Sequence, residues 1–412
     1  MKLETPPGTR DFLPEEMAKR QEVVDRIRAT FELYGFAPAE TPAFEYAELL
    51  EGKYGEEEKL IYKFEDLGGR KLALRYDLTV PLVRMVAMNQ LPMPFKRYCI
   101  SRVWRFDRPQ KGRYREFWQC DVDIVGVASM KADAEIVSCA IDALEALGLR
   151  GFRFKINSRK VLDDILVKIG IPKDKELAVF RALDKLEKQG EGAVRKELEA
   201  AGIQKIDELF KALKTKDIQG IRKLVGETEG VRELEELLKL LRAYKKGVAI
   251  DLSMVRGLDY YTGPIFEVEL GSYGSIAGGG RYDKLIGQIS GKEMPAVGIS
   301  LGVERIIEVM REKKLLPKSR GVRAYVLCAD ERSEETALQI LKELRESGIS
   351  AEGDLLGRNF SNQMKYANRS GAQMVVIVGQ KDLEKGEITI RDMETGKQRT
   401  IRRENIIKEV LG

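Results

Sequence analysis

The spacing of hydrophobic residues predicts an amphipathic first helix followed by a mixture of strands and helices. Residues 15–33 follow Pro14 and carry apolar side chains at helical spacing, namely Val23, Val24, Ile27 and Phe31. Beyond them, apolar and alternating segments predict strands at residues 71–74, 98–104 and 152–156 and a helix at residues 133–147. Residues 1–157 are therefore expected to form a core that contains both kinds of element.

The character of the chain changes twice beyond residue 157. Residues 158–246 are rich in Lys and Glu and predict helices, one of which carries leucines at positions i, i+3, i+4 and i+7: Leu234, Leu237, Leu238 and Leu241. Strand patterns resume at Val248 and lead to a helix after Gly302. We therefore expect a helical insertion at 158–246, a second part of the core at 247–312 and a breaker-rich linker at 313–321.

The remaining residues, 322–412, alternate strand and helix patterns over a length typical of a small domain. Strands are predicted at residues 323–328, 349–352 and 374–378, helices at 333–347 and 360–370, and a hairpin at 388–401. These residues are expected to fold as a separate α/β domain.

Composition agrees with a globular protein of several domains. The chain has 412 residues, more than one hydrophobic core usually supports, which predicts two or three domains. Its net charge of +5 is too small to indicate nucleic-acid binding by itself. The sequence has no run of 18 apolar residues and no signal-like N-terminal core, so we expect no membrane segment and predict a cytoplasmic location.

The chain contains no histidine. Histidine triads, histidine metal sites and histidine general bases are therefore excluded, whatever the fold. The four cysteines are scattered without a C-x-x-C pair, as expected of reduced thiols rather than zinc ligands. No metal centre held by the protein alone is expected.

Residues 105–126 combine an arginine-rich loop with a polar strand face. The loop contains a Pro and a Gly and carries Arg105, Arg108, Arg113 and Arg115, whose guanidinium groups can close on phosphate oxygens. From Glu116 the pattern alternates, so that one face of a strand carries Phe117, Gln119, Asp121 and Asp123. This layout is typical of a site that holds a polyphosphate beside a small cationic substrate. The alternative is a hairpin with solvated arginines and surface carboxylates.

Further segments favour a binding site. Residues 251–263 place Arg256 and the adjacent Tyr260 and Tyr261 on an expected strand that ends in Gly-Pro. Residues 278–280 are three glycines between strand-like stretches, which indicates close approach of the backbone to a ligand or to another strand. Residues 298–305 then lead into an apolar helix.

In their order along the chain, these segments resemble signature motifs of class II histidyl-tRNA synthetases. Residues 105–117 are similar to the second signature motif, residues 251–263 and 277–283 to two histidine-specific motifs, and residues 298–305 to the third signature motif. Residues 8–14, 34–45 and 75–81 resemble the family's opening, first motif and amino-acid-binding segment, and residues 119–124 resemble its archaeal and eukaryotic branch. So many motifs in the family's order leave little room for coincidence.

The resemblance implies an α+β fold, with an antiparallel-sheet catalytic core of class II type, a helical insertion and a C-terminal α/β anticodon-binding domain. It implies a histidine–tRNA ligase that uses ATP, with Mg²⁺ on the phosphates, to form histidyl-adenylate and then acylates the 3' end of tRNA(His). This reaction needs no histidine base, because the substrate carboxylate is already a nucleophile. The first motif implies a homodimer.

Roles for single residues also follow from the resemblance. Arg105 is expected at the α-phosphate of ATP, and Asp107, where the class usually has Glu, orders the motif or the adenine. Phe117 stacks on adenine, while Arg305 covers its other face or meets the γ-phosphate. The alternative interpretation of Phe117 is a core residue.

The catalytic charge and the histidine pocket are assigned in the same way. Arg256 is expected to neutralise the α-phosphate and carboxylate, supported by Arg113, and a carboxylate partner for Arg256 is expected from Asp259 or Asp283. The remaining candidates bind histidine: Asp77, Thr79 and Gln119 at the α-amino group, Asp123 and Tyr261 at the imidazole nitrogens, and Tyr260 and Tyr282 around the pocket. Asp123 replaces a Glu of bacterial members. In the C-terminal domain, the cations available for tRNA phosphates, which are otherwise solvated surface charges, are Arg358, Lys365, Arg369, Lys381 and Arg399.

Two other functions remain open at this point. Synthetase-like regulatory subunits of ATP phosphoribosyltransferase resemble the same core, but typically lack the C-terminal domain and the specific arginine, both of which this chain has. A module that only binds tRNA is disfavoured by the arginines that face ATP. A P-loop ATPase is disfavoured because the sequence has no Gly-x-x-x-x-Gly-Lys-Ser/Thr segment.

Overall fold

The computed structural model describes residues 2–109, 112–256, 260–317 and 321–411. The chain forms two compact units, Met1–Leu316 and Pro317–Gly412. Part of the expected linker, residues 318–320, lies outside the described residues. Within the described ranges, every helix is too short or too polar to cross a lipid bilayer.

An eight-stranded sheet forms the centre of the first unit. Its strand order is β1-β5-β6-β11-β10-β9-β7-β8, and the strands are antiparallel except for the parallel outer pairs β1·β5 and β7·β8. The strands are β1 (Ala37–Pro38), β5 (Phe95–Trp104), β6 (Glu116–Val125), β7 (Arg153–Ser158), β8 (Ala249–Ile250), β9 (Pro264–Glu269), β10 (Ser275–Arg281) and β11 (Ala296–Gly302).

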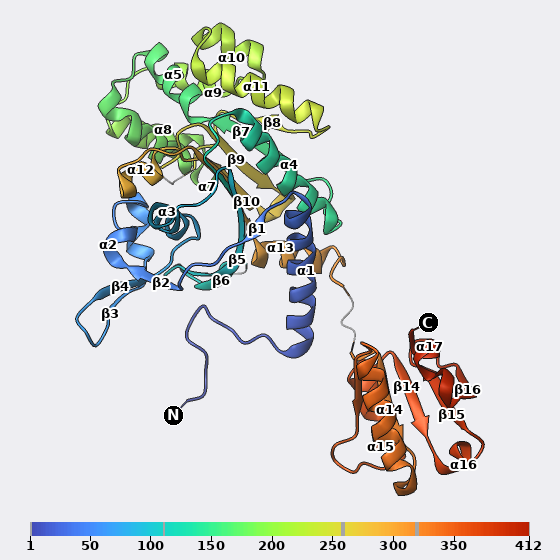
Figure 1. Ribbon diagram of the computed structural model, residues 1–412. Coiled ribbons are helices and arrows are strands. Elements are labelled where there is room, and N and C mark those ends of the chain that lie inside the picture. The colour runs from blue at the N-terminus through green and yellow to red at the C-terminus, as the bar shows by residue number, and fades with distance from the viewer. Residues whose placement is uncertain (1, 110–111, 257–259, 318–320, 412) are drawn as a thin grey trace. The chain divides into compact units, whose positions relative to one another are not determined.

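One face of this sheet is covered by α1 (Pro14–Leu33), α4 (Met130–Ala146) and α13 (Val303–Glu312) (Figure 1). The apolar stripe predicted for the first helix is buried in this core, where Val24 and Phe31 share a cluster with Val122 and Ile124 of β6. Burial of such a stripe removes large apolar side chains from water and is the main force that holds the helix on the sheet.

The opposite face carries a second, smaller core. It is built with α2 (Ala47–Leu50), α3 (Thr79–Met88) and α12 (Leu285–Ser290), beside a three-stranded sheet of β2 (Phe44–Tyr46), β4 (Lys71–Leu74) and β3 (Lys63–Glu65) (Figure 1). Helix α3 packs on α12, and the cluster reaches the sheet through Val125 and Ile265. This layer leaves the middle of the sheet open for a site.

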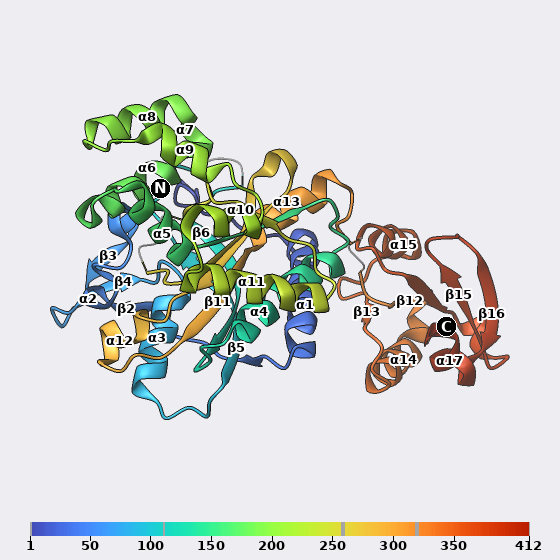
Figure 2. The same ribbon diagram turned by 90° about the horizontal axis from the view of Figure 1, so that it is seen from above.

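Helices fill the interval between β7 and β8 (Figure 2). They are α5 (Arg159–Ile169), α6 (Glu176–Asp184), α7 (Leu186–Gln189), α8 (Glu191–Ala200), α9 (Ile206–Leu213), α10 (Ile218–Val225) and α11 (Glu229–Ala243). Leu234, Leu237 and Leu241 of α11 are buried and Leu238 is half-buried, as the leucine spacing predicts.

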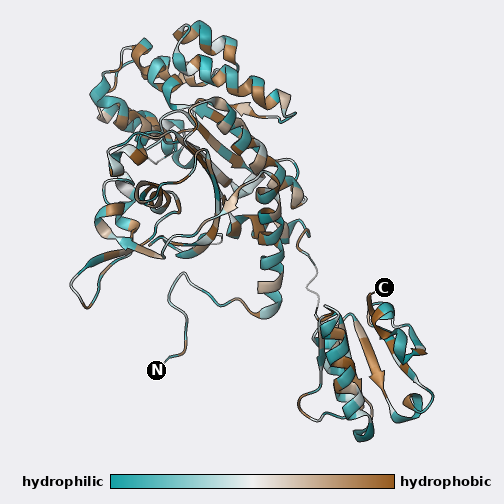
Figure 3. Cartoon of the chain, in the orientation of Figure 1, coloured by the Kyte–Doolittle hydropathy of each residue, from teal (hydrophilic) through white to brown (hydrophobic). Residues whose placement is uncertain are grey.

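The second unit is a five-stranded sheet with helices on both faces. Its strand order is β13-β12-β14-β15-β16, formed by β12 (Ala324–Cys328), β13 (Ala351–Gly353), β14 (Met374–Val378), β15 (Glu387–Asp392) and β16 (Gln398–Arg402). Its helices are α14 (Glu334–Glu346), α15 (Phe360–Arg369), α16 (Gln380–Leu383) and α17 (Ile406–Leu411). The central strand β14 is apolar throughout and fully buried (Figure 3), as expected for a strand covered on both sides. The predicted fold class is confirmed for both units.

One predicted strand is wrong. The described residues between β8 and β9, 251–256 and 260–263, form turns and irregular backbone. The cause is local: Asp251 accepts hydrogen bonds from the backbone and hydroxyl of Ser253, and the N–H of Met254 bonds to the Asp251 carbonyl, which bends the chain. Gly-Pro therefore opens β9 instead of ending a strand, and Arg256, Tyr260 and Tyr261 stand on a loop.

Candidate active site

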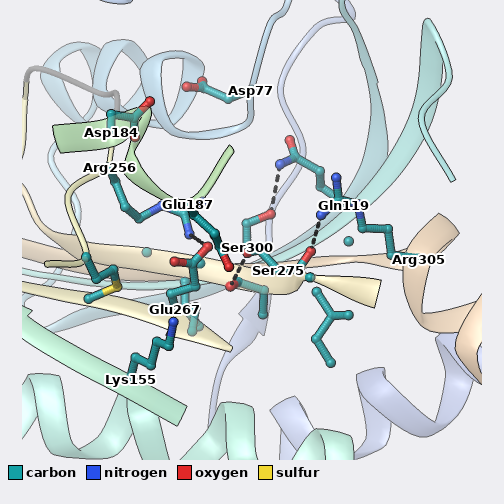
Figure 4. Close-up of a pocket in the computed structure, with 18 of the residues that line it drawn as sticks. Asp77, Gln119, Lys155, Asp184, Glu187, Arg256, Glu267, Ser275, Ser300 and Arg305 are labelled. Atoms are coloured by element: carbon teal, nitrogen blue, oxygen red, sulfur yellow. Dashed lines mark hydrogen bonds and ion pairs between the residues drawn. The ribbon is translucent and has the colours of Figure 1, made fainter. Parts of the chain in front are cut away.

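A cavity of about 730 Å³ opens on the sheet face opposite α1 and α4 (Figure 4). Its walls come from β6, β10, β11, the loop before β6, the loop before β9 and the insertion. It is lined by each residue to which the resemblance assigns a role in binding ATP or histidine: Asp77, Thr79, Arg105, Asp107, Arg113, Phe117, Gln119, Asp123, Arg256, Tyr260, Tyr261, Tyr282 and Arg305. Arg108 and Arg115, the other two arginines of the predicted phosphate loop, do not line it. The structure thus brings together segments more than two hundred residues apart.

Strand β6 supplies one wall through the alternation seen in its sequence. Phe117, Gln119, Asp121 and Asp123 line the cavity, while Cys120, Val122 and Ile124 are buried in the core on the other face. Gln119 donates from Nε2 to the hydroxyl of Ser300 on β11 at 2.8 Å. Its Oε1 is buried and has no hydrogen-bond partner among the described residues. The wall therefore offers an acceptor to a ligand.

Asp123 is fixed by two neighbours at the bottom of the cavity. The hydroxyl of Tyr282 donates to Oδ1 at 2.6 Å, and the guanidinium of Arg97 lies 2.9 Å from Oδ2. Burial raises the pKa of Asp123, and the charge of Arg97 and the hydrogen bond from Tyr282 oppose that rise. Burial and the charge of Asp123 raise the pKa of the neighbouring Asp121 to about 7. This end of the cavity is therefore acidic, with a carboxyl group that titrates near neutrality.

Asp77 joins the acidic end from the start of α3. Its Oδ1 accepts hydrogen bonds from the N–H groups of Thr79 and Val80, each at 3.0 Å, which holds the helix start in place. Its Oδ2 is buried without a hydrogen-bond partner in the described part of the chain. Burial raises the pKa of this carboxyl. An ammonium group would satisfy the free oxygen.

Arginines crowd the other end of the cavity. Arg105 donates from Nε to the carbonyl of Tyr76 at 3.1 Å, and its guanidinium lies 4.2 Å from the centre of the Tyr76 ring. Arg113 pairs with Asp107 at 2.9 Å. Burial together with repulsion from Arg113 and Arg256 lowers the pKa of Arg305, which donates to the carbonyl of Ser275. Half-buried arginines gathered in one cavity are complementary to a polyanion.

Arg256 lies against Gly278, the first of the three glycines of β10. Its Nη1 is 3.2 Å from Oε1 of Glu267 on β9, and a Cβ atom on Gly278 would lie only 1.9 Å from Nη1 (Figure 4). The glycine is needed for close approach, as predicted, and the group that approaches is a side chain. The expected carboxylate partner was wrong for Asp283, whose Oδ1 instead accepts from Arg281 and from the N–H of Ala296. Asp259 lies outside the described residues.

Sequence reasoning missed several residues of the site. Arg97 could have been found by extending the hairpin register, because it pairs directly with Asp123 across β5 and β6. Glu267 is one of two polar positions in β9, with Glu269, and the other residues of the strand are apolar. Asp184 and Glu187, from the end of α6 and from α7, also line the cavity. These two have no signal of their own, because they look like any solvated position of a Lys/Glu-rich helix.

Comparison with known proteins agrees with this arrangement. Residues 8–306 match the histidyl-tRNA synthetase family and residues 323–412 match the anticodon binding domain family. The histidine–tRNA ligase of Aeropyrum pernix is 45% identical over 413 residues, which cover 95% of this chain and 94% of that protein.

Solved structures give the same result. The crystal structure of histidyl-tRNA synthetase from Nostoc sp. PCC 7120 has a TM-score of 0.88 at 30% identity, covering 100% of this chain and 99% of that one. A Bacillus halodurans C protein described as an ATP phosphoribosyltransferase regulatory subunit/histidyl-tRNA synthetase has a TM-score of 0.76 at 26% identity, covering 91% of this chain and 97% of that one. The chain therefore belongs to the histidyl-tRNA synthetase family.

Proposed function

We propose that this chain carries out the histidine–tRNA ligase reaction in the cavity on β6, β10 and β11. The observation that supports it best is that one cavity is lined both by three buried carboxyl groups, Asp77, Asp121 and Asp123, which we call its acidic end, and by four arginines, Arg105, Arg113, Arg256 and Arg305, which we call its cationic end. The acidic end suits the ammonium and imidazole groups of histidine, and the cationic end suits ATP, which enters with Mg²⁺ on its phosphates. The histidine carboxylate lies between them.

In the proposed reaction, a carboxylate oxygen of histidine bonds to the α-phosphorus of ATP as the bond to the bridging oxygen of pyrophosphate breaks. No proton has to be removed, so positioning and charge neutralisation carry the catalysis. Arg105 and Arg256 neutralise the charge at the α-phosphate and carboxylate. Arg113, held by Asp107 at 2.9 Å, supports them.

The adenine base and the phosphates of ATP beyond the α-phosphate occupy the rest of the cationic end. Phe117 stacks on adenine, which is supported by its place on the cavity side of β6. Arg305 contacts the nucleotide from the opposite wall. Its lowered pKa reflects neighbouring positive charge that ATP would offset.

Histidine binding is assigned to the acidic end. Oδ2 of Asp77 and Oε1 of Gln119, two of the buried acceptors that line the cavity, receive the α-amino group together with Thr79. Asp123 and Tyr261 contact the imidazole nitrogens. Tyr282 closes the pocket and holds Asp123, while Tyr260 packs against the other two tyrosines, with ring centres 5.0 and 6.1 Å away. The three rings exclude water from the substrate.

Transfer to tRNA(His) completes the proposed function. Residues 322–412 are assigned to the anticodon, residues 158–246 to the insertion, and residues 1–157 and 247–312 to the core. Of the candidate phosphate contacts, Arg358 pairs with Asp354 at 2.6 Å and Arg399 with Glu409 at 2.5 Å, so these two have to exchange partners to bind RNA. The cytoplasm is the proposed location.

The active form is proposed to be a homodimer. The first motif ends in β2, where Phe44 and Tyr46 are half exposed, and Phe64 of β3 lies 6.4 Å from Phe44 between ring centres. Adjacent exposed aromatic side chains of this kind are typical of protein interfaces.

Histidine-dependent exchange of labelled pyrophosphate into ATP, followed by charging of tRNA(His), tests the function. Exchange and charging are expected for histidine alone among amino acids. A regulatory subunit would bind histidine without exchange, and that result would contradict the proposal.

A further inference from the structure

Aromatic and arginine side chains interleave where the N-terminal segment, residues 7–12, meets the core. The guanidinium of Arg10 lies 4.6 Å from the centre of the Phe12 ring and 4.1 Å from that of Tyr114. The guanidinium of Arg20 lies 4.5 Å from the same Phe12 ring and 5.4 Å from Trp118. Phe12 thus stands between two arginines, an arrangement in which the ring face attracts both cations.

Glu304 holds the two arginines together. It accepts from Arg10 at 2.7 Å and from both terminal nitrogens of Arg20, which is 2% exposed. It also accepts from the backbone N–H of Trp118 at 3.3 Å. Glu304 is in the first turn of α13 and directly precedes Arg305, so the N-terminal segment is tied to the helix start that presents Arg305 to the cavity.

The same segment contacts the arginine loop, residues 105–115. The N–H of Arg115 donates to the carbonyl of Gly8 at 2.8 Å, and the Arg115 side chain reaches the carbonyl of Pro7 at 3.4 Å. The Gly8 backbone also lies close to the Arg115 side chain: a Cβ atom on Gly8, whose φ is +84°, would lie 2.6 Å from Cγ of Arg115. Tyr114, which stacks on Arg10, belongs to the same loop and lines the cavity.

From these contacts we infer that residues 7–12 form a strap that positions the ATP-binding groups from two sides, the arginine loop and Arg305. Phe12 and Arg10 are positioning residues that act through Tyr114, Arg115 and Glu304. The acidic end of the cavity takes no part in this network, so the strap acts on ATP and not on histidine. The inference rests on the proposed function, because it assigns the cationic end to ATP.

Phe12→Leu tests the strap, because it keeps an apolar side chain but removes the ring that both arginines use. In pyrophosphate exchange, we expect KM for ATP to rise roughly fivefold or more while KM for histidine stays within about twofold of wild type. Phe12→Tyr keeps the ring and should restore the ATP KM. Leu13→Ala is the matched control, because Leu13 is the next residue and is 72% exposed.

Arg10→Lys is a second test in case Phe12→Leu folds poorly: it keeps the charge for Glu304 but loses the planar group stacked on Phe12 and Tyr114. It should also raise KM for ATP alone. Equal changes in both KM values, or a lowered unfolding midpoint with unchanged KM for ATP, would overturn the strap. Calorimetric measurement of ATP binding to each variant distinguishes failure of the strap from failure of the proposed function. If the wild-type protein shows no pyrophosphate exchange, the proposed function is contradicted. If Phe12→Leu binds ATP as the wild type does, the strap is contradicted.

Discussion

Gly278→Ala should disable Arg256 without removing it. The added Cβ would lie 1.9 Å from Nη1 and 2.2 Å from Cζ of Arg256, whereas ordinary contact begins at 3.4 Å, so the guanidinium has to move by about 1.5 Å. The backbone at Gly278 tolerates alanine, because its φ is not in the left-handed region. Since a displacement of about 1 Å at a reacting centre can cost roughly a hundredfold in rate, we expect a loss of about that size in adenylation.

Comparison with Gly279→Ala separates the effect of a displaced arginine from the effect of a damaged sheet. Gly279→Ala would place Cβ 2.1 Å from the carbonyl oxygen of Gly298 and 2.6 Å from Cα of Ile299, so the strands themselves have to shift. We expect Gly279→Ala to lower the unfolding midpoint clearly and Gly278→Ala to leave it nearly unchanged.

Pyrophosphate exchange measured for Gly278→Ala, Arg256→Ala and the double variant completes the test. If the glycine acts only by making room for Arg256, both single variants lose about a hundredfold and the double variant loses little more than Arg256→Ala. Losses that multiply in the double variant would refute the reasoning, as would near-normal exchange by a folded Arg256→Ala protein.

Further predictions concern the buried carboxylates and the C-terminal unit. In the folded protein Asp121 has a pKa of about 7, against 3.8 for an ordinary carboxyl, so the folded state keeps a proton between these values that the unfolded state has lost. Stability should therefore fall as pH rises from about 4 to 7, and Asp121→Asn should flatten this slope in urea unfolding at pH 5 and pH 8; an unchanged slope would contradict the pKa. Asp123→Asn should alter the pH profile of histidine binding and leave ATP binding nearly unchanged, and calorimetric profiles parallel to wild type with equal affinity would show that Asp123 does not touch the imidazole. A chain that ends at Leu316 should still activate histidine but charge tRNA(His) poorly, and normal charging by the shortened protein would contradict the assignment of the second unit.

The pattern of neighbouring residues was sufficient to predict which face of a strand or helix a side chain occupies, because this depends only on residues close in sequence. The alternation from Phe117 to Ile124 assigns one face of β6 to the cavity and the other to the core, because a strand turns each successive side chain to the opposite face. The burial of the α11 leucines was predicted in the same way, since a helix brings positions three and four apart onto one side. The loop before β9 was misread because the hydrogen bonds of one side chain, Asp251, outweighed the strand pattern of its apolar neighbours.

Contacts between residues far apart in sequence could not be predicted in this way, and the glycines of β10 show why. The sequence indicates only that something comes close to residues 278–280, since any approaching group demands the same missing Cβ. In the structure each glycine makes room for different groups: the Arg256 side chain at Gly278, the backbone of β11 at Gly279, and the Pro264 carbonyl with the Tyr261 ring at Gly280. Arg256 and Tyr261 come from the loop before β9, and their approach depends on how the whole chain places that loop over the sheet. The sequence therefore shows which positions need a missing Cβ atom, because glycine itself records that need. Which group occupies the space depends on the complete fold.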